Sequence, residues 1–292
     1  MLIAGPTASG KSALALRFAE ELDGVIVNTD SMQVYDLLNV LTARPPAEDL
    51  ARAPHHLYGC TLPSIRFSTG LWLNAVQGVA SQPDVAGRAL IFVGGTGLYF
   101  QALINGFSPT PDVPVAVLQK WNDEVAGLDR DGRRTLLDRY DPRMSARMRE
   151  PDPQRVVRAL SVLDATGRSL TEWQDVPKGG LSPDAQVEKI VLNPDRKLLA
   201  QRIADRFAGM LENGAVDEVE ALLALDLPAD LPAMKAIGVR QISDWLAGRA
   251  TRDEAIELSV NATRQYAKRQ RTWFRKRMDQ QEVLYHLEKP FE

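Results

Sequence analysis

Residues 5–12, Gly-Pro-Thr-Ala-Ser-Gly-Lys-Ser, are the clearest indication of chemistry in this chain. Their spacing matches G-x4-G-K-[S/T], with a short apolar run before the motif and apolar side chains at helical spacing after it. Backbone N–H groups of such a loop, and of the helix that follows, bind phosphate oxygens, while the lysine neutralises their charge. The motif therefore predicts a phosphate-binding loop (P-loop) that holds a pyrophosphate-bearing small molecule.

Each position of this loop is a predicted diphosphate-binding residue. Lys11 is also counted as catalytic, and Ser12 is predicted to bind Mg²⁺, the one cofactor that we expect. The complete loop set is Gly5, Pro6, Thr7, Ala8, Ser9, Gly10, Lys11 and Ser12.

Two further apolar runs end in polar residues. Residues 25–27 run into Asn-Thr-Asp-Ser, and residues 89–93 run into Gly-Gly-Thr-Gly. Both are typical of buried parallel strands, whose carboxyl ends line a ligand crevice in an open α/β sheet. Asp30, in the first of these ends, is predicted to be a general base at the crevice. Mg²⁺ ligation and the capping of a helix are its alternative roles.

The remaining pattern predicts an interrupted α/β fold, in which a P-loop NTPase-like parallel sheet flanked by helices carries a mainly helical insertion domain. Helical spacing replaces strand-like runs over residues 107–184, so the core comprises residues 1–106 and 185–292, with a later strand at 187–192 and a helical C-terminal region. Within the insertion, Asp152 and Gly167 suit the two ends of one helix. Prolines punctuate the insertion at Pro109, Pro111, Pro114, Pro142, Pro151, Pro153, Pro177 and Pro183.

Composition excludes several classes of protein. The single cysteine, Cys60, allows neither an internal disulfide nor a four-cysteine zinc site, and no apolar run reaches the length of a membrane span. We therefore expect a cytoplasmic protein without membrane contact. A net charge of −3 argues against coating of nucleic acid by the whole surface, although residues 263–278 carry seven cations and no carboxylate. That stretch either grips RNA, or its aromatic residues anchor a helix whose cations remain solvated.

Five segments together resemble the motif set of tRNA dimethylallyltransferases of the bacterial type. They are residues 5–12, 30–35, 94–99, 236–241 and 263–273, in the order that the family shows. The resemblance implies transfer of a dimethylallyl group from dimethylallyl diphosphate to the N6 amine of the adenine 3′ to a tRNA anticodon, giving N6-(dimethylallyl)adenosine and releasing diphosphate. It also implies that Arg206 clamps the diphosphate. The expected partners are this donor and a tRNA anticodon stem-loop, and we expect the protein to act as a monomer.

The residues fit this reaction chemically. Negative charge grows on the departing diphosphate, which requires preorganised donors, and the attacking amine must lose a proton, for which Asp30 is placed. Thr96 is a predicted catalytic residue that orients the amine. The adenine must leave its stack, so recognition should follow shape, phosphates and stacking. The predicted tRNA-binding residues are Asp30, Ser31, Met32, Gln33, Thr96, Gln154, Arg155, Val156, Val157, Arg158, Lys235, Gly238 and Arg240.

One segment departs from the family pattern, and three alternatives stay open. Residues 36–45 lack the glycine that the family generally shows, which leaves the path of that loop undefined, and no zinc-finger extension is expected of a bacterial-type enzyme. The alternatives are a free-adenylate isopentenyltransferase, a non-enzymatic RNA-binding module and a small-molecule kinase. A kinase would use a lid of arginines formed by Arg147, Arg149, Arg155 and Arg158.

Overall fold

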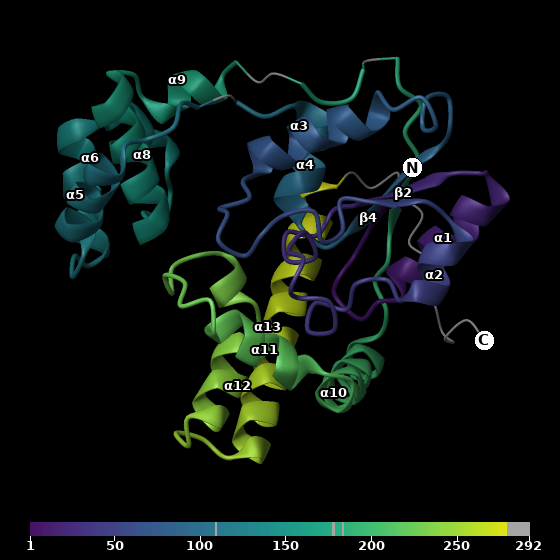
Figure 1. Ribbon diagram of the computed structural model, residues 1–292. Coiled ribbons are helices and arrows are strands. Elements are labelled where there is room, and N and C mark those ends of the chain that lie inside the picture. Colours follow the sequence, from purple (N-terminus) through teal and green to yellow (C-terminus); the bar gives the residue numbers. More distant parts are fainter. Residues whose placement is uncertain (109, 177–178, 183, 279–292) are drawn as a thin grey trace. The chain divides into compact units, whose positions relative to one another are not determined.

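The computed structural model describes residues 1–108, 110–176, 179–182 and 184–278 (Figure 1). Residues 279–292, the end of the predicted second core segment, lie outside the described residues, as do Pro109, Pro177 and Pro183. The chain divides into two compact units. One contains residues 1–101 and the chain from residue 182 onward, hereafter the α/β unit, and the other contains residues 102–181, hereafter the helical unit.

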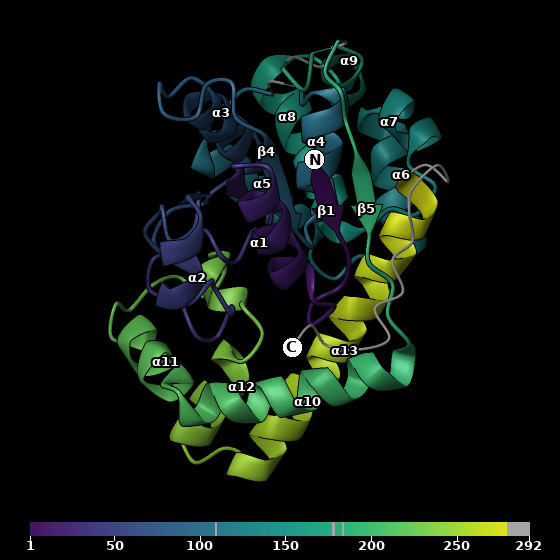
Figure 2. The same ribbon diagram turned by 90° about the vertical axis from the view of Figure 1, so that its right-hand side faces the viewer.

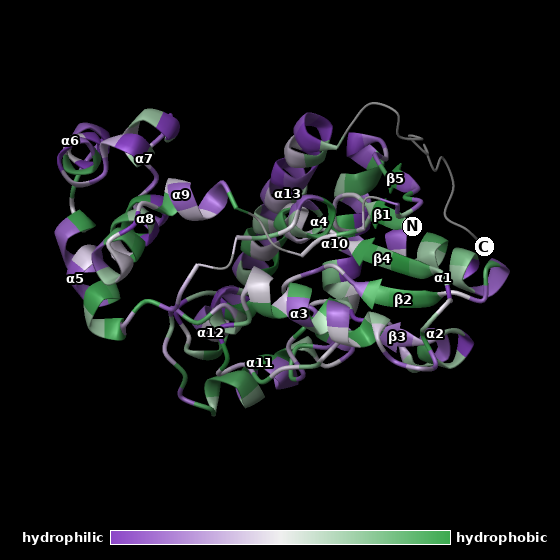
Figure 3. Cartoon of the chain, turned by 90° about the horizontal axis from the view of Figure 1, so that it is seen from above, coloured by the Kyte–Doolittle hydropathy of each residue, from purple (hydrophilic) through white to green (hydrophobic). Residues whose placement is uncertain are grey.

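A five-stranded parallel sheet forms the centre of the α/β unit, in the order β3-β2-β4-β1-β5. The strands β1, β2 and β4 are almost entirely buried because both faces of a parallel sheet are covered. The strands are accordingly mostly hydrophobic (Figure 3). The sheet confirms the predicted fold class. The strand β3 was not predicted, because two residues carry no periodic pattern. The strands are β1 (Leu2–Ala4), β2 (Val25–Asn28), β3 (His55–His56), β4 (Leu90–Gly94) and β5 (Lys189–Val191).

Helices cover the sheet and extend from its carboxyl end. The helix α1 packs on β1 and β4 (Figure 2). This packing buries an apolar cluster that includes Leu14, Ile26 and Ile91. The helix α4 continues across the boundary between the two units. The helices that begin or lie in this unit are α1 (Lys11–Glu21), α2 (Ala47–Arg52), α3 (Thr69–Ala80), α4 (Gly97–Asn105), α10 (Arg196–Glu212), α11 (Ala215–Leu223), η1 (Ala233–Lys235), α12 (Val239–Leu246) and α13 (Arg252–Arg277).

A second apolar cluster joins α10, α11, α12 and α13 to the segment that follows β2. Tyr35, Leu38 and Leu41 of that segment pack with Phe207 and Val219 of the helices. The helix α13 begins at Thr251, whose hydroxyl accepts the N–H of Glu254, while the Glu254 carboxylate accepts the N–H of Thr251 at 2.7 Å. Its 26 residues are therefore held both at the start and by this core, and they carry the predicted basic stretch back towards the sheet.

The helical unit has its own core of apolar residues, including Trp121, Leu137 and Leu160. As predicted, α8 starts at Asp152, whose carboxylate accepts the N–H of Arg155, and stops at Gly167, which has a φ of 69°. No described residue belongs to a helix long and apolar enough to cross a membrane. The helices of this unit are α5 (Val115–Val125), α6 (Arg130–Tyr140), α7 (Pro142–Arg147), α8 (Pro153–Thr166) and α9 (Leu170–Gln174).

Candidate functional site

The P-loop joins β1 to α1 through backbone conformations that its glycines permit. Gly10 adopts a φ of 91° immediately before α1 and provides no side chain to cap the helix. A side chain at Gly5 would place its Cβ 2.8 Å from the carbonyl oxygen of Leu192. The amides of the first turn of α1 therefore face an anion site that no capping side chain fills.

Polar side chains of the loop line a cavity of about 480 Å³. The ammonium group of Lys11 donates to the carbonyl oxygen of Pro6 at 2.7 Å. The Ser9 hydroxyl is buried, and it has no hydrogen-bond partner among the described residues. Burial lowers the pKa of Lys11 to about 8, an effect that the Asp30 carboxylate opposes and that the Arg206 guanidinium reinforces. The cavity thus contains a cation and an unpaired hydroxyl where an anion would be stabilised.

Asp30 stands just after β2, and the buried side chain of Asn28 holds its backbone. The amide oxygen of Asn28 accepts the N–H of Asp30 at 2.8 Å, and its amide nitrogen donates to the carbonyl oxygen of Asp30 at 2.9 Å. The Asp30 carboxylate accepts the N–H of Met32 at 2.9 Å. No helix follows, so Asp30 closes a turn and the alternative of a helix cap is wrong.

Thr96 lies beside Asp30 because hydrogen bonds join the ends of β2 and β4. Its hydroxyl accepts the N–H of Ser31 at 2.9 Å, and its own N–H donates to the carbonyl oxygen of Thr29 at 3.1 Å. A Cβ at Gly94 would stand 2.1 Å from the carbonyl oxygen of Thr29, so only glycine allows this approach. Two of the three predicted catalytic side chains, Asp30 and Thr96, therefore come from adjacent strand ends.

Gln270 of α13 connects the P-loop to the segment Gly94–Gly97 at the end of β4, hereafter the glycine turn, and sequence reasoning missed it. Its side-chain oxygen accepts the N–H of Thr7 at 2.9 Å, and its side-chain nitrogen donates to the carbonyl oxygen of Gly95 at 2.9 Å. The residue is buried. The one feature of the sequence that could have indicated Gln270 is its neutral amide side chain within a run of cations, one helical turn after Tyr266.

Tyr266 lies close to the same groups. Burial raises the pKa of the Tyr266 hydroxyl, whereas the hydrogen bonds of Tyr266 to Thr96 and Gln270 oppose that rise.

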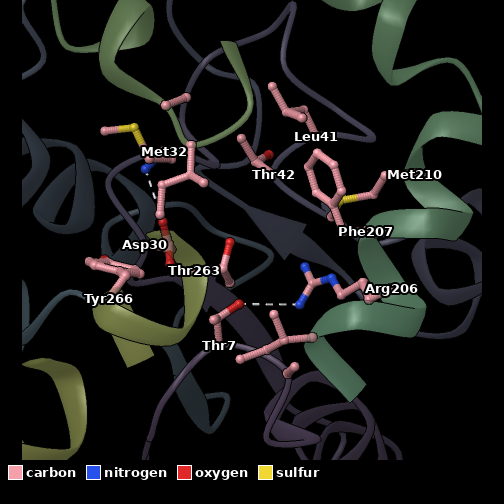
Figure 4. A pocket seen from close by; sticks show the side chains of 14 residues that line it. Thr7, Asp30, Met32, Leu41, Thr42, Arg206, Phe207, Met210, Thr263 and Tyr266 are labelled. Carbon is pink, nitrogen blue, oxygen red and sulfur yellow. Dashed lines mark hydrogen bonds between the residues drawn. The ribbon is translucent and has the colours of Figure 1, made fainter. Parts of the chain in front are cut away.

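A second cavity, of about 100 Å³, adjoins the first and is largely apolar (Figure 4). Arg206 of α10 points towards the P-loop, where its guanidinium donates to the Thr7 hydroxyl at 3.3 Å. Burial lowers the pKa of Arg206, and the nearby Asp30 opposes the change. Sequence reasoning did not identify most of the apolar lining, which includes Leu41, Ile203, Phe207, Met210 and Ile237.

The two cavities share a border, which gives the site one charged and one apolar end. Asp30, Arg206 and Thr7 line both of them. A small molecule that carries a diphosphate and a short hydrocarbon would match this division, with Asp30 beside the junction.

The segment at residues 36–45, where the sequence departs from the family pattern, follows a defined path. Arg44 donates to the carbonyl oxygen of Asp36 at 3.0 Å. The side chain of Gln33 donates to the carbonyl oxygens of Thr42 and Ala43 at 3.0 and 2.7 Å. Gln33, a predicted tRNA-binding residue, is therefore already engaged in shaping this segment.

The predicted tRNA-binding residues of the α/β unit fall into two groups. Ser31 and Met32 lie next to Asp30, whereas Lys235 and Arg240 are exposed on η1 and α12. Gly238 is buried with a φ of 103°, and a Cβ there would stand 2.6 Å from a methyl carbon of Leu41. Its role in the structure is thus to allow close packing beside the apolar cavity.

In the helical unit, α8 exposes some of the predicted residues and buries others. Gln154, Arg155 and Arg158 are exposed, and Arg158 donates to the hydroxyl of Thr110 at 2.6 Å. Val156 and Val157 are buried in the core of this unit, so their side chains support the helix. Helical periodicity turns both side chains inward, and their predicted contact with tRNA stays a prediction.

Of the two interpretations of the basic stretch of α13, the structure supports the anchored helix. Phe274 is buried, and a Cβ at Gly97 would lie 2.3 Å from the ring of Trp273, so the aromatic residues do anchor the helix. The cations Arg264, Lys268, Arg269, Arg275, Lys276 and Arg277 are exposed. The interpretation of this stretch as a helix anchored by its aromatic residues is confirmed. The exposed cations of the helix stay available for an anionic partner.

The oxygen donors of the site suit Mg²⁺ only together with a substrate. Ser12 and Asp30 line the same cavity, and their oxygens are ligands that this ion prefers. The described part of the chain contains no group of three or more His, Cys, Asp or Glu side chains arranged for a metal. A Mg²⁺ ion would therefore take its remaining ligands from diphosphate oxygens and water, as is usual for this ion.

Comparisons with known proteins agree with this geometry. The model of a family described as IPP transferase matches residues 33–277. The tRNA dimethylallyltransferase of Chelativorans sp. (strain BNC1) is 56% identical over 274 residues, which cover 94% of each chain. The corresponding protein of Rhizobium johnstonii is 51% identical over 279 residues, covering 96% of this chain and 94% of the relative.

Solved structures extend the similarity to three dimensions. The tRNA isopentenylpyrophosphate transferase of Bacillus halodurans has a TM-score of 0.68 and 31% identity, covering 98% of this chain and 88% of the other. A eukaryotic dimethylallyltransferase described as acting on tRNA has a TM-score of 0.76 and 28% identity, covering 94% and 69%. The family model matches most of this chain, and the relatives match nearly all of it. These matches show that the chain belongs to the tRNA dimethylallyltransferase (IPP transferase) family.

Proposed function

We propose that this protein transfers the dimethylallyl group of dimethylallyl diphosphate to the N6 amine of the adenine 3′ to the anticodon of tRNA. The observation that carries the proposal is the two-part site, in which an anion-binding P-loop adjoins an apolar cavity and Asp30 lies at their border. Membership of the family supports the same reaction.

The leaving group is stabilised by the charged end of the site. As the bond between the allylic carbon and the diphosphate oxygen breaks, negative charge grows on the diphosphate. The P-loop amides, Lys11 and Arg206 are donors that face this position before the reaction begins. The diphosphate departs with the electron pair of the broken bond, and the apolar cavity shields the allylic group from water.

The acceptor amine is activated by the pair Asp30 and Thr96. The nitrogen forms the new bond to the allylic carbon, and the proton that it loses passes to the Asp30 carboxylate. The Thr96 hydroxyl, which is already held next to Ser31, orients the amine. Tyr266 lies at the border of the apolar cavity and offers a ring beside the entering adenine.

Mg²⁺, bound through Ser12 with Asp30 nearby, would supply positive charge to the diphosphate. The remaining groups belong to the protein itself, so the diphosphate should retain part of its affinity without the ion.

The tRNA would be bound by exposed cations rather than by the reaction site alone. Arg155 and Arg158 of α8, and Lys235 and Arg240 of η1 and α12, are the predicted contacts to the anticodon stem-loop. Within the α/β unit, the exposed cations of α13 are further candidate contacts to phosphate. The adenine must leave its stack to reach Asp30, which costs a few kcal/mol that these backbone contacts offset. We further propose a cytoplasmic monomer.

The test is incubation of the pure protein with labelled dimethylallyl diphosphate, Mg²⁺ and either an unmodified anticodon stem-loop or free AMP. Label on the stem-loop alone would support the proposal. Label on AMP alone would instead indicate a free-adenylate isopentenyltransferase. Label on neither acceptor, together with ATP turnover in the presence of a small acceptor, would favour a kinase and overturn the proposal.

A further inference from the structure

The apolar cavity owes part of its wall to a segment that has no regular secondary structure. Leu41 and Thr42 line the apolar cavity, and Thr42 and Arg44 line the larger cavity at the P-loop. Residues 36–46 contain neither a helix nor a strand of the sheet. The position of these side chains therefore depends on whatever holds the backbone of the segment.

One carboxylate on α11 holds three consecutive backbone amides of this segment. Glu218 Oε1 accepts the N–H of Asn39 at 3.0 Å and the N–H of Val40 at 2.6 Å. Glu218 Oε2 accepts the N–H of Leu41 at 2.9 Å. Hydrogen bonds to an ionised acceptor are about twice as strong as neutral ones, so this contact is a strong local constraint.

The carboxylate is itself held in place by the core. Ala215, Val219 and Leu222 of α11 are fully buried in the same apolar cluster as Leu38 and Leu41. Glu218 precedes Val219 directly and is only partly exposed. The helix therefore holds the Glu218 carboxylate at a fixed position against the segment. The segment in turn places the side chain of Leu41 in the wall of the apolar cavity.

We propose that Glu218 is a positioning residue that sets the shape of the donor's alkyl site. The proposal rests on the proposed function, because it assumes that the apolar cavity holds the alkyl group of the donor. Glu218 does not line either cavity, so it acts through the backbone of residues 39–41 and not through contact with a substrate.

The consequence is a specific kinetic pattern. In Glu218→Ala the three amides lose their acceptor, and Leu41 and Thr42 lose their fixed position. The Michaelis constant for dimethylallyl diphosphate should rise about tenfold or more, as expected for the loss of hydrogen bonds to a charged group. The kcat at saturating donor and the Michaelis constant for the stem-loop should change less than about threefold, since Asp30 and Thr96 are held by other bonds.

Donor selectivity separates this role from general support of the fold. Geranyl diphosphate has the same diphosphate and a longer allylic chain, so its use depends on the apolar wall. The ratio of kcat/KM for dimethylallyl over geranyl diphosphate should fall in Glu218→Ala. Glu218→Gln, which keeps the size and one neutral acceptor oxygen, should lie between this variant and the wild type.

The experiment compares the wild type, Glu218→Ala, Glu218→Gln and Glu220→Gln with both donors, using the stem-loop as acceptor. Glu220 is exposed on the same helix, so Glu220→Gln is the matched control and should equal the wild type. If Glu218→Ala unfolds, Glu218→Gln alone decides the outcome. Wild-type constants in a folded Glu218→Gln, or equal loss with both donors, would overturn the inference. A wild type that does not turn over would instead refute the proposed function.

Discussion

The two units of this protein place their candidate functional residues in opposite ways. In the α/β unit, the P-loop amide of Thr7 bonds to Gln270, which lies 263 residues away in the sequence, and the groups around Asp30 are half-buried and hydrogen-bonded to one another. In the helical unit, Arg155 and Arg158 stand on the exposed face of one helix. Single substitutions in the α/β unit should therefore strongly reduce activity. Substitutions in the helical unit should instead weaken tRNA binding in small steps, through the loss of positive charge.

The largest effect is expected from Asp30→Asn. The variant keeps the size of the side chain and an acceptor for the N–H of Met32 but loses the base, so the single-turnover rate should fall by about 10² or more. Binding of the donor and the stem-loop should change little. Asp84→Asn, at an exposed position of the same unit, is the control and should react at the wild-type rate. A wild-type single-turnover rate in Asp30→Asn would remove Asp30 from the chemistry.

Gln270→Ala tests whether the hydrogen bonds from Gln270 to the P-loop and the glycine turn contribute to stability and activity. The variant leaves the N–H of Thr7 and the carbonyl oxygen of Gly95 without their partner, which should lower the free energy of unfolding by about 1–3 kcal/mol. The single-turnover rate should also fall, by about tenfold, since the P-loop and the glycine turn lose their common support. Stability is measured by urea unfolding. Gln265→Ala, an exposed change on the same helix, should alter neither quantity.

The pKa of Lys11, lowered to about 8 by burial, predicts pH-dependent donor binding. A bound diphosphate favours the charged lysine, so the dissociation constant should rise as pH increases above about 8, by at most about tenfold per pH unit. The stability of the free enzyme should change in the opposite direction and increase with pH. Because its folded state binds fewer protons than the unfolded state between pH 8 and the ordinary value of 10.5, the contribution of Lys11 to the free energy of unfolding increases over that range.

Titration calorimetry from about pH 7 to 9.5 measures this dependence. Lys11→Arg should remove most of the change in affinity, because a guanidinium stays charged throughout. A wild-type affinity that stays constant over this range would show that Lys11 does not lose its proton there.

The smallest effect is expected in the helical unit. Replacing both Arg155 and Arg158 by glutamine should weaken binding of the stem-loop several-fold. The slope of log affinity against log salt should become shallower by about 0.7 for each phosphate that is no longer neutralised. Stability should hardly change, since both side chains are exposed. Arg139→Gln, on another helix of the same unit, serves as the charge control. An unchanged salt slope would mean that α8 does not bind phosphate.

Local patterns were enough to predict much of the fold. The strands β1, β2 and β4 are short apolar runs that end in polar residues, and α8 lies between Asp152 and Gly167 as its capping residues indicate. These features depend on neighbours within a few residues, so periodicity and capping chemistry are sufficient to recognise them. The P-loop belongs to the same class, because its glycines, lysine and serine act within one turn.

The sequence alone thus determined the type of sheet, the P-loop and the candidates Asp30 and Thr96, through motifs and the rule that parallel strand ends meet at one edge. Only the tertiary structure decided that Gln270 joins the P-loop to the glycine turn, that Glu218 holds residues 39–41, and that α10 supplies part of the wall of the apolar cavity. The physical reason is distance along the chain. The hydrogen bonds of Gln270 and Glu218 join segments that lie 175 or more residues apart, and no local periodicity records which distant side chain a backbone amide will meet.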